Sequence, residues 1–214
     1  MLKKNSWFLR FFLMIFGILL ISICVGCYRL GAFGVDAFTG MNLGISGFLG
    51  LSFGTWQLIA NALILIVVFF TVPGYIGLGT VVNMVGVGYI ADFLCWLVKD
   101  AAGIEMTLPL RILALLLGTL FASFGVALYM KADMGIAPYD SLAPIIAKLT
   151  KDKIPFQYAR ICSDITAIVI GLLFCLAAKG NIWTIIGIGT IINALFNGPL
   201  IQFFRNKIDK KISL

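Results

Sequence analysis

Six long apolar runs set the limits on what this chain can fold into. An α-helix needs about 20 apolar residues to cross the hydrocarbon core of a bilayer, and most of the runs approach or exceed that length. A soluble globule of 214 residues could not bury them, because 61% of the residues are hydrophobic and 12% are charged. The sequence therefore predicts an all-α integral membrane protein with six transmembrane helices. The runs occupy residues 11–28, 58–72, 75–98, 112–130, 165–178 and 182–204.

Two of these runs are too short to cross a membrane without polar neighbours. The run at 58–72 must include the residues just before it, and the run at 165–178 needs residues 156–164. This second extension contains Arg160 and Asp164. Both charged side chains are therefore expected inside the membrane or at its edge.

A repeated heptad indicates an internal duplication. "GLGTVVN" at residues 77–83 returns as "GIGTIIN" at residues 187–193. Apolar bias explains the exchanged aliphatic residues, but it does not explain identities at Gly, Thr and Asn in the same order. Gln57 and Gln157 also correspond, at an offset of 100. We therefore expect one membrane domain, residues 1–214, built from two repeats. The repeats are expected at residues 8–100 and 109–206.

The first apolar run has features of a signal peptide, since basic residues precede it. It also has an internal counterpart at residues 111–131, where an export signal could not act. At an offset of 101, Arg10 corresponds to Arg111 and Tyr28 to Tyr129. The first run is therefore predicted to be a permanent transmembrane span.

Each half contains a long span, a polar stretch and two further spans. The polar stretches are residues 31–50 and 132–153. Pro138 and Pro144 break the second stretch, and its apolar part is too short to cross a membrane. Each stretch is therefore predicted to form a short re-entrant or interfacial helix. Three spans per half place the second half upside down relative to the first, as in inverted-repeat transporters.

The distribution of positive charge agrees with a cytoplasmic N-terminus and C-terminus. A parallel arrangement of four spans per half also fits the charges, so the preference for inverted repeats rests on helix length. In the inverted arrangement, the residues expected on the cytoplasmic side are Lys3, Lys4, Arg10, Lys131, Lys148, Lys151, Lys153, Arg205, Lys207, Lys210 and Lys211. Those expected outside are Arg29, Lys99, Arg111 and Lys179.

Several kinds of functional site are not expected. The chain has no histidine, and its five cysteines lie in apolar runs, so we expect no metal site and no cofactor. The net charge of +7 follows the topology pattern and does not indicate nucleic-acid binding. The loops are too short for a folded soluble module, and no P-loop is visible. The protein is therefore not expected to be an enzyme.

The stretch "MGIAPYDSLAP" is the strongest candidate for a functional site. A broken helix start in a membrane exposes free backbone amides and the positive end of a helix dipole, which favour an anionic group. Asp140 either binds a ligand there or caps the short helix. In the alignment of the two halves, Phe38 corresponds to Tyr139 and Thr39 to Asp140. Asp36 is nearby but out of register.

The motifs "GIAPYDSL" and "GIGTIIN" resemble the YczE- and YitT-like family of bacterial membrane proteins, with YczE the closer. The resemblance covers nearly the whole chain. It implies a small multi-span protein of the bacterial plasma membrane, in a family without an established substrate. It carries no catalytic residues over to this sequence.

Two pairs of polar residues are further candidates. Asn83 and Asn193 occupy matching positions after "GxGT", and they either pack helices together or face one another across a polar cavity. Arg160 and Asp164 lie four residues apart on one helical face. Such a pair marks either a substrate path or a neutralised internal strut. Asp92 is expected to be solvated near the interface.

The leading hypothesis is a small secondary transporter or permease that moves a small polar or anionic molecule through a site between the repeats. Two alternatives remain open: a membrane accessory protein that binds a partner, and a substrate-binding subunit of an energy-coupled complex. A water-accessible cavity between Asp140, Asn83 and Asn193 would favour transport, whereas a sealed core would favour the accessory role. Lipid is the expected surrounding, and an oligomer or partner protein is left open. The candidate substrate-binding residues are Asp140, Tyr139, Asn83, Asn193, Arg160, Asp164, Gln57 and Gln157.

Overall fold

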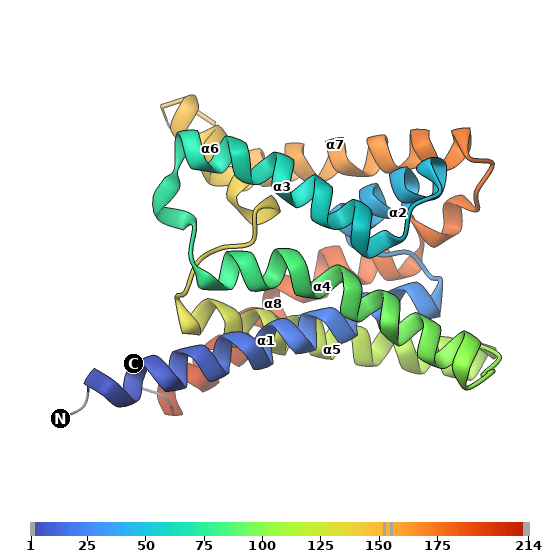
Figure 1. Cartoon of the computed structure of the whole chain (residues 1–214), viewed down its shortest axis with the longest axis horizontal. Helices are drawn as coiled ribbons and strands as arrows, with labels where there is room; N and C mark the ends of the chain where they lie inside the picture. Colours follow the sequence, from blue (N-terminus) through green and yellow to red (C-terminus); the bar gives the residue numbers. More distant parts are fainter. Residues whose placement is uncertain (1–2, 152, 155, 212–214) are drawn as a thin grey trace.

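The computed structural model describes residues 3–151, 153–154 and 156–211, and it contains helices and no strands within these ranges. Figure 1 shows two layers, with α1, α4, α5 and α8 in one and α3 and α7 in the other. The shorter α2 and α6 lie beside α7 and α3. The long helices are α1 (Lys3–Gly31), α3 (Phe53–Thr71), α4 (Leu78–Trp96), α5 (Leu108–Ala132), α7 (Phe156–Ala177) and α8 (Ile188–Lys211). The short elements are α2 (Ala37–Leu49), η1 (Pro73–Tyr75), the π-helical η2 (Leu97–Ala101), η3 (Tyr139–Ser141), α6 (Leu142–Leu149) and η4 (Ile182–Thr184).

The long helices confirm the prediction of an all-α membrane protein. Within the described residues, five helices are long and apolar enough to cross a bilayer. A sixth span forms if Ile182–Asn197 and Pro199–Lys210, bent by 41°, are counted as one. Pro199 lies inside α8, where its ring disturbs the helical hydrogen bonds and accounts for the bend. Both Arg160 and Asp164 belong to α7, as expected.

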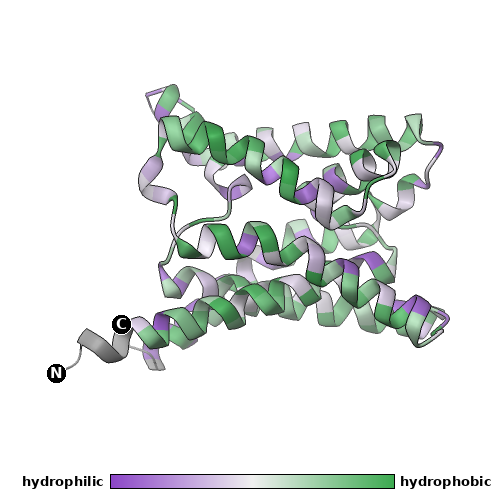
Figure 2. Ribbon diagram, viewed as in Figure 1, coloured by the Kyte–Doolittle hydropathy of each residue, from purple (hydrophilic) through white to green (hydrophobic). Residues whose placement is uncertain are grey.

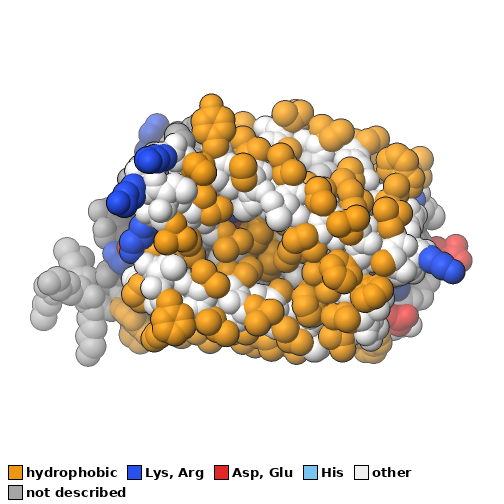
Figure 3. Space-filling view, turned by 90° about the horizontal axis from the view of Figure 1, so that it is seen from above, with side chains coloured by type: hydrophobic (Ala, Val, Ile, Leu, Met, Phe, Trp, Pro, Cys, Tyr) orange, Lys and Arg blue, Asp and Glu red, His pale blue; other side chains and the backbone are white. Residues whose placement is uncertain are grey.

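The outer surface is suited to lipid. Large apolar side chains such as Phe70, Phe8 and Leu116 are more than 60% exposed. Figure 2 shows hydrophobic residues along the lengths of the helices, with the most hydrophilic residues concentrated near their ends. Figure 3 shows one apolar face with Lys and Arg side chains gathered at the ends of the molecule. The protein is therefore a multi-pass membrane protein.

The first helices of the two halves, α1 and α5, pack closely and run antiparallel. Arg111, near the start of α5, donates hydrogen bonds to the Gly31 and Ala32 carbonyls at the end of α1, at 2.7 and 3.0 Å. A Cβ at Gly17 would lie 2.8 Å from the Gly125 carbonyl oxygen, so only glycine permits this approach. An antiparallel pair is what the inverted arrangement predicts.

The chain re-enters the molecule after α1 and again after α5. Figure 1 shows the segment before α2 and the segment before α6 coming from opposite ends of the bundle toward its interior. The helices α2 and α6 then lead back toward the ends from which the chain came. The two polar stretches thus contain short helices, as the prolines and the short apolar lengths indicated.

The repeated heptads hold these re-entrant segments by matching hydrogen bonds. The Gly79 amide donates to the Met134 carbonyl at 2.7 Å, and the Gly189 amide donates to the Phe33 carbonyl at 2.7 Å. In each case a heptad of one half binds the re-entrant segment of the other half. A Cβ at Gly77 would lie 2.3 Å from the Met134 oxygen, which explains why the heptad begins with glycine. The pattern supports the duplication; superposition of the halves about an axis in the membrane plane stays a prediction.

Candidate functional site

The two re-entrant segments meet at a pair of aromatic rings. Phe38, in the first turn of α2, stacks on Tyr139 of η3, with 4.4 Å between ring centroids and 20° between planes. These are the two residues that correspond in the alignment of the halves. The starts of the two short helices therefore lie against each other inside the protein.

A charged cluster surrounds Tyr139. The Arg160 guanidinium donates to Asp140 at 2.7 Å and to Asp164 at 3.1 Å. The Tyr139 hydroxyl donates to the other oxygen of Asp164 at 2.6 Å. Arg160 also lies 5.1 Å from the centroid of the Tyr139 ring, where the ring face attracts a cation. Four of the predicted site residues are thus brought together, and Arg160 links α7 to the start of the second re-entrant helix.

A further carboxylate, Asp36, belongs to the same region, although the sequence alignment left it out of register. It is the N-cap of α2, and its side chain accepts a hydrogen bond from the Thr39 amide at 3.0 Å. It lies close enough to Arg160 and Asp164 to interact with them electrostatically. An aspartate directly before an apolar helix is a recognised N-cap signal, and this signal was available in the sequence.

The cluster contains more negative than positive charge. Asp140 and Asp164 are two carboxylates, and Arg160 is the single guanidinium paired with both. Charged groups at membrane depth are expensive unless they are paired or hydrated. The excess of carboxylate therefore favours a proton or a cation here over an anion.

Of the two alternatives for Asp140, the helix cap finds no support in the described hydrogen bonds, although Asp140 does lie at the start of a short helix. Pro138 is the N-cap of η3 and Ser141 that of α6, and neither helix start has a side-chain cap. Asp140 lies inside the turn and points to Arg160, and its side chain is about half exposed. The reason is tertiary: α7 brings a guanidinium within reach, and a charged partner attracts a carboxylate more strongly than a backbone amide.

Buried amide side chains on α2 and α3 have unmatched hydrogen-bonding atoms. Among the described residues, the Gln57 Oε1, the Asn61 Nδ2 and both polar atoms of Asn42 have no partner. These side chains are 4%, 1% and 0% exposed, respectively. Gln57 and Asn61 lie one turn apart on α3, and Asn42 lies one turn from Phe38 on α2. The Gln157 side chain lies outside the described part of the chain.

Asn83 and Asn193 are both buried, and each is the sixth residue of its helix. Asn193 accepts hydrogen bonds from the Tyr28 hydroxyl and from the Asn197 amide. Over the described ranges, Asn83 makes no side-chain hydrogen bond, and none joins it to Asn193. Among the described residues, the buried hydroxyl of Tyr129, the counterpart of Tyr28, has no hydrogen-bond partner. The observed contacts of Asn193 fit helix packing.

The sequence led us to expect a solvated Asp92, but its carboxylate is paired within the protein. It forms an ion pair with Arg29 at 2.7 Å and accepts a hydrogen bond from the Gly54 amide at 2.6 Å. Arg29 also lies 4.4 Å from the centroid of the Phe53 ring. These contacts join α1, α3 and α4 near one end of the molecule. Arg29 and Asp92 are 63 positions apart, so this pair could not be predicted from neighbouring residues.

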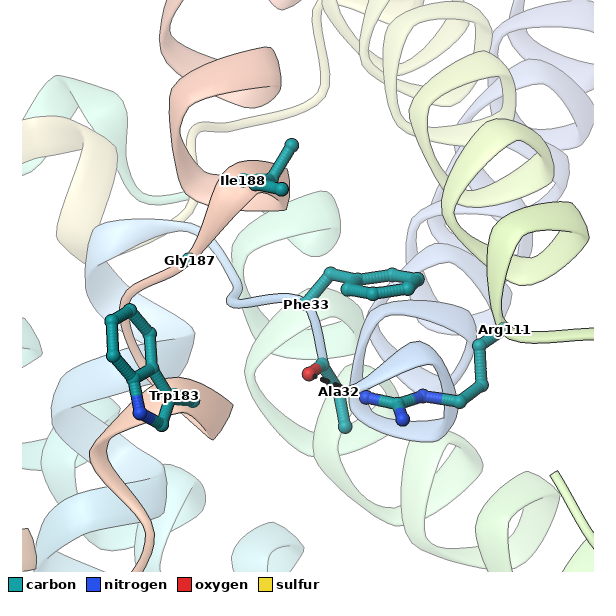
Figure 4. Close-up of a pocket in the computed structure, with 6 residues that line it drawn as sticks. All are labelled: Ala32, Phe33, Arg111, Trp183, Gly187 and Ile188. Carbon is teal, nitrogen blue, oxygen red and sulfur yellow. Dashed lines mark hydrogen bonds between the residues drawn. The ribbon is translucent and has the colours of Figure 1, made fainter. Parts of the chain in front are cut away.

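Pockets open on the described part of the molecule near Arg111 and near Lys99. Figure 4 shows the first, where Arg111 lies beside Phe33 and the carbonyl of Ala32, with Trp183 on the other side. Its volume is about 260 Å³. The second lies beside Lys99 and has a volume of about 310 Å³. Neither pocket is lined by Asp140, Asn83 or Asn193, where a cavity was expected.

Comparisons with known proteins match most of the chain. Residues 8–206 match a family described as "Family of unknown function (DUF6198)". "Uncharacterized membrane protein YczE" of Bacillus subtilis (strain 168) is 26% identical over 94% of this chain and 87% of its own length. "Uncharacterized protein YyaS" of the same organism is 25% identical, with 91% of each chain covered. An "Uncharacterized protein" of Haemophilus influenzae is 26% identical over 92% of this chain and 83% of its own. No solved structure matches. The resemblance to YczE is thus confirmed.

Proposed function

The chain belongs to the DUF6198 family, whose function is unknown, and from the geometry of its site we propose that it is a small secondary transporter. It moves a small polar molecule through the region between the two halves. The re-entrant segments, their stacked rings and the charged cluster around Tyr139 form the site. A proton or a cation exchanges at the carboxylates and couples the movement of the solute to an ion gradient.

The meeting of two re-entrant helix starts at a charged cluster is the observation that carries this proposal. Non-helical backbone inside a membrane persists where it is buried in protein or lines a path for polar species. Transporters use interrupted helices in this way, with solute and ion sites near the interface between repeats. Charged side chains in such a region are costly, and apolar packing is often as stable, so the three charged side chains of the cluster support a role beyond packing.

The chemistry of the region favours an uncharged hydrogen-bonding group on the solute near the re-entrant tips. The unmatched atoms of Asn42, Gln57 and Asn61 include both donors and acceptors. Leaving such atoms unpaired costs about 1–3 kcal/mol each in a protein interior. A solute with hydroxyl or amide groups would satisfy them. Because carboxylates outnumber cations at the cluster, an anionic group should bind there most weakly.

The test uses purified protein reconstituted into lipid vesicles. The vesicles are incubated in an extract of bacterial small molecules, with and without a pH gradient, and their contents are analysed by mass spectrometry. Wild-type vesicles should accumulate at least one small polar solute above protein-free vesicles. Asp164→Asn should abolish most of this accumulation, because it removes the charge between Arg160 and Tyr139. Asp209→Asn, a change to an exposed carboxylate paired with Lys131, serves as the matched control.

Two outcomes would count against transport. Vesicles that accumulate no solute under any gradient, although the protein is folded, would favour the accessory protein or the subunit of a larger complex. Equal accumulation by wild type and Asp164→Asn would place the path elsewhere in the molecule.

A further inference from the structure

The second pocket, which we name the Lys99 pocket, lies where the ends of α1, α4 and α7 approach α2. Its volume of about 310 Å³ is enough for a small solute. Its lining includes the charged and polar side chains of Arg29, Lys99 and Asn181 and the backbone of Gly47. Cys95 and Ile185 also line the pocket. The pocket is separate from the charged cluster around Tyr139.

The wall of the Lys99 pocket carries unbalanced positive charge. The charge of Arg29 is matched by Asp92, whose two oxygens are engaged by Arg29 and by the Gly54 amide. Lys99 is exposed and has no ion-pair partner within the part of the chain that the structure describes. Asn181 adds an amide beside these cations. A small solute that enters the pocket therefore meets one unpaired ammonium group.

The floor of the pocket lies next to the first re-entrant segment. Ile185 is only 2% exposed, and its carbonyl accepts a hydrogen bond from the Val35 amide at 3.2 Å. A Cβ at Gly40 would come within 2.9 Å of the Ile185 side chain. Asp36 follows Val35 directly in the chain. Ile185 thus separates the Lys99 pocket from the start of α2 and from the charged cluster behind it.

We propose that the Lys99 pocket is the access vestibule of the transport path and binds a small soluble molecule that carries an anionic group, such as a carboxylate or a phosphate. Lys99 and Arg29 hold the anionic group, and the uncharged part of the solute faces the floor at Ile185. The role as a vestibule rests on the proposed transport function, whereas the binding of anions does not. A solute with an anionic end and a hydroxyl- or amide-bearing end would place the anionic end in this pocket, and its uncharged end would face the re-entrant tips.

The first experiment measures the electrostatic potential of the pocket without knowledge of the substrate. A single thiol is placed by Gly47→Cys in a variant without the five native cysteines, since a Cβ at Gly47 meets nothing within 4 Å. In detergent, the labelling rate by a sulfonate-bearing methanethiosulfonate is divided by the rate for a trimethylammonium-bearing one. The ratio removes any effect of thiol ionisation, because both reagents attack the same thiolate. Lys99→Gln should lower this ratio by about threefold or more, as expected for one charge a few ångströms away.

Lys153→Gln, which removes the same charge from the other end of the molecule, is the matched control and should leave the ratio unchanged. A ratio that does not respond to Lys99→Gln would overturn the proposal. So would a faster reaction with the cationic reagent in the parent variant.

The second experiment tests binding. Inorganic phosphate and acetate, compared with chloride at equal ionic strength, should slow the labelling of the Gly47→Cys thiol by uncharged N-ethylmaleimide. This protection should disappear in Lys99→Gln. Equal labelling rates with and without the anions would refute the site. Protection by phosphatidylglycerol in vesicles without protection by phosphate or acetate would show a lipid headgroup site and would also overturn the proposal. If anions bind but vesicles take up no solute, the proposed transport function fails and the anion site stands.

Discussion

At the scale of single residues, the two halves use their aspartates differently. Asp36 caps α2 through the Thr39 amide, whereas Asp140 binds Arg160 and caps no helix. The cap is local and could be predicted from a few neighbouring letters. The ion pair depends on how α7 packs against the second re-entrant segment, and 20 residues separate its members. The sequence therefore indicated the Arg160–Asp164 pair, four residues apart on one helix. It did not indicate that Asp140 also pairs with Arg160.

Because only Asp36 caps a helix, alanine and asparagine should differ in their effect on stability at Asp36 but not at Asp140. Asp36→Ala should destabilise the protein by about 1 kcal/mol, and Asp36→Asn should retain most of the stability, since asparagine caps a helix equally well. Asp140→Ala and Asp140→Asn should resemble each other and change stability by less than about 1 kcal/mol, because a half-exposed ion pair contributes little. Unfolding of the purified variants in a mild detergent measures both pairs. A large difference in the free energy of unfolding between the two Asp140 variants would show that Asp140 caps a helix.

At the scale of elements, glycine decides how closely the short helix α2 approaches its neighbour. A Cβ at Gly44 would lie 2.1 Å from the Gly171 carbonyl oxygen of α7. A Cβ at Gly171 would in turn lie 2.6 Å from the Gly40 carbonyl oxygen. Small residues commonly allow such contacts between membrane helices. The sequence did not tell which helix α2 packs against.

Two glycines one turn apart on α2 give a matched test of this contact. Gly44→Ala should destabilise the protein by about 1–3 kcal/mol, because the added methyl group meets backbone atoms that cannot move aside easily. Gly47→Ala, where a Cβ meets nothing within 4 Å, should be neutral or stabilising by up to about 1 kcal/mol through helix propensity. Thermal unfolding in detergent compares them. Equal stability of the two variants would contradict the close α2–α7 contact.

The re-entrant segments show how much of an element could be predicted. Pro138 and the short apolar length of 132–153 indicated a short helix, and η3 and α6 lie there. The heptads could be recognised in the sequence as a repeat. Their hydrogen bonds to the re-entrant segment of the opposite half could not be predicted. Hydrogen bonds such as Gly79 to Met134 join backbone atoms, and these carry no sequence signature.

At the scale of the whole molecule, the start of α1 and the end of α8 lie at the same end of the bundle (Figure 1). This placement agrees with an even number of spans. The six apolar runs were enough to predict the spanning helices, because each one is a local property of composition. Whether Asn83 and Asn193 face a common cavity depends on the relative rotation of the helices, which apolar periodicity does not determine, so that cavity stays a prediction.

The arrangement leads to a prediction about sidedness. Single thiols at Lys99 and Lys151, placed in a variant without native cysteines, should be labelled from opposite sides of the membrane. An impermeant reagent added to intact cells should reach the thiol at Lys99, and the thiol at Lys151 should react only after the cells are opened. Labelling of both positions from the same side would support the parallel arrangement of four spans per half.

A covalent link between the two re-entrant tips tests whether these tips meet inside the protein. Cysteines replace Phe38 and Tyr139, whose rings are stacked at 4.4 Å, in the variant without native cysteines, and a short bifunctional methanethiosulfonate reagent links them. Because the two tips meet in the structure, we expect efficient cross-linking within one chain in native membranes, detected by mass spectrometry and released by a reductant. Absence of the cross-link in the folded protein would show that the two tips do not meet.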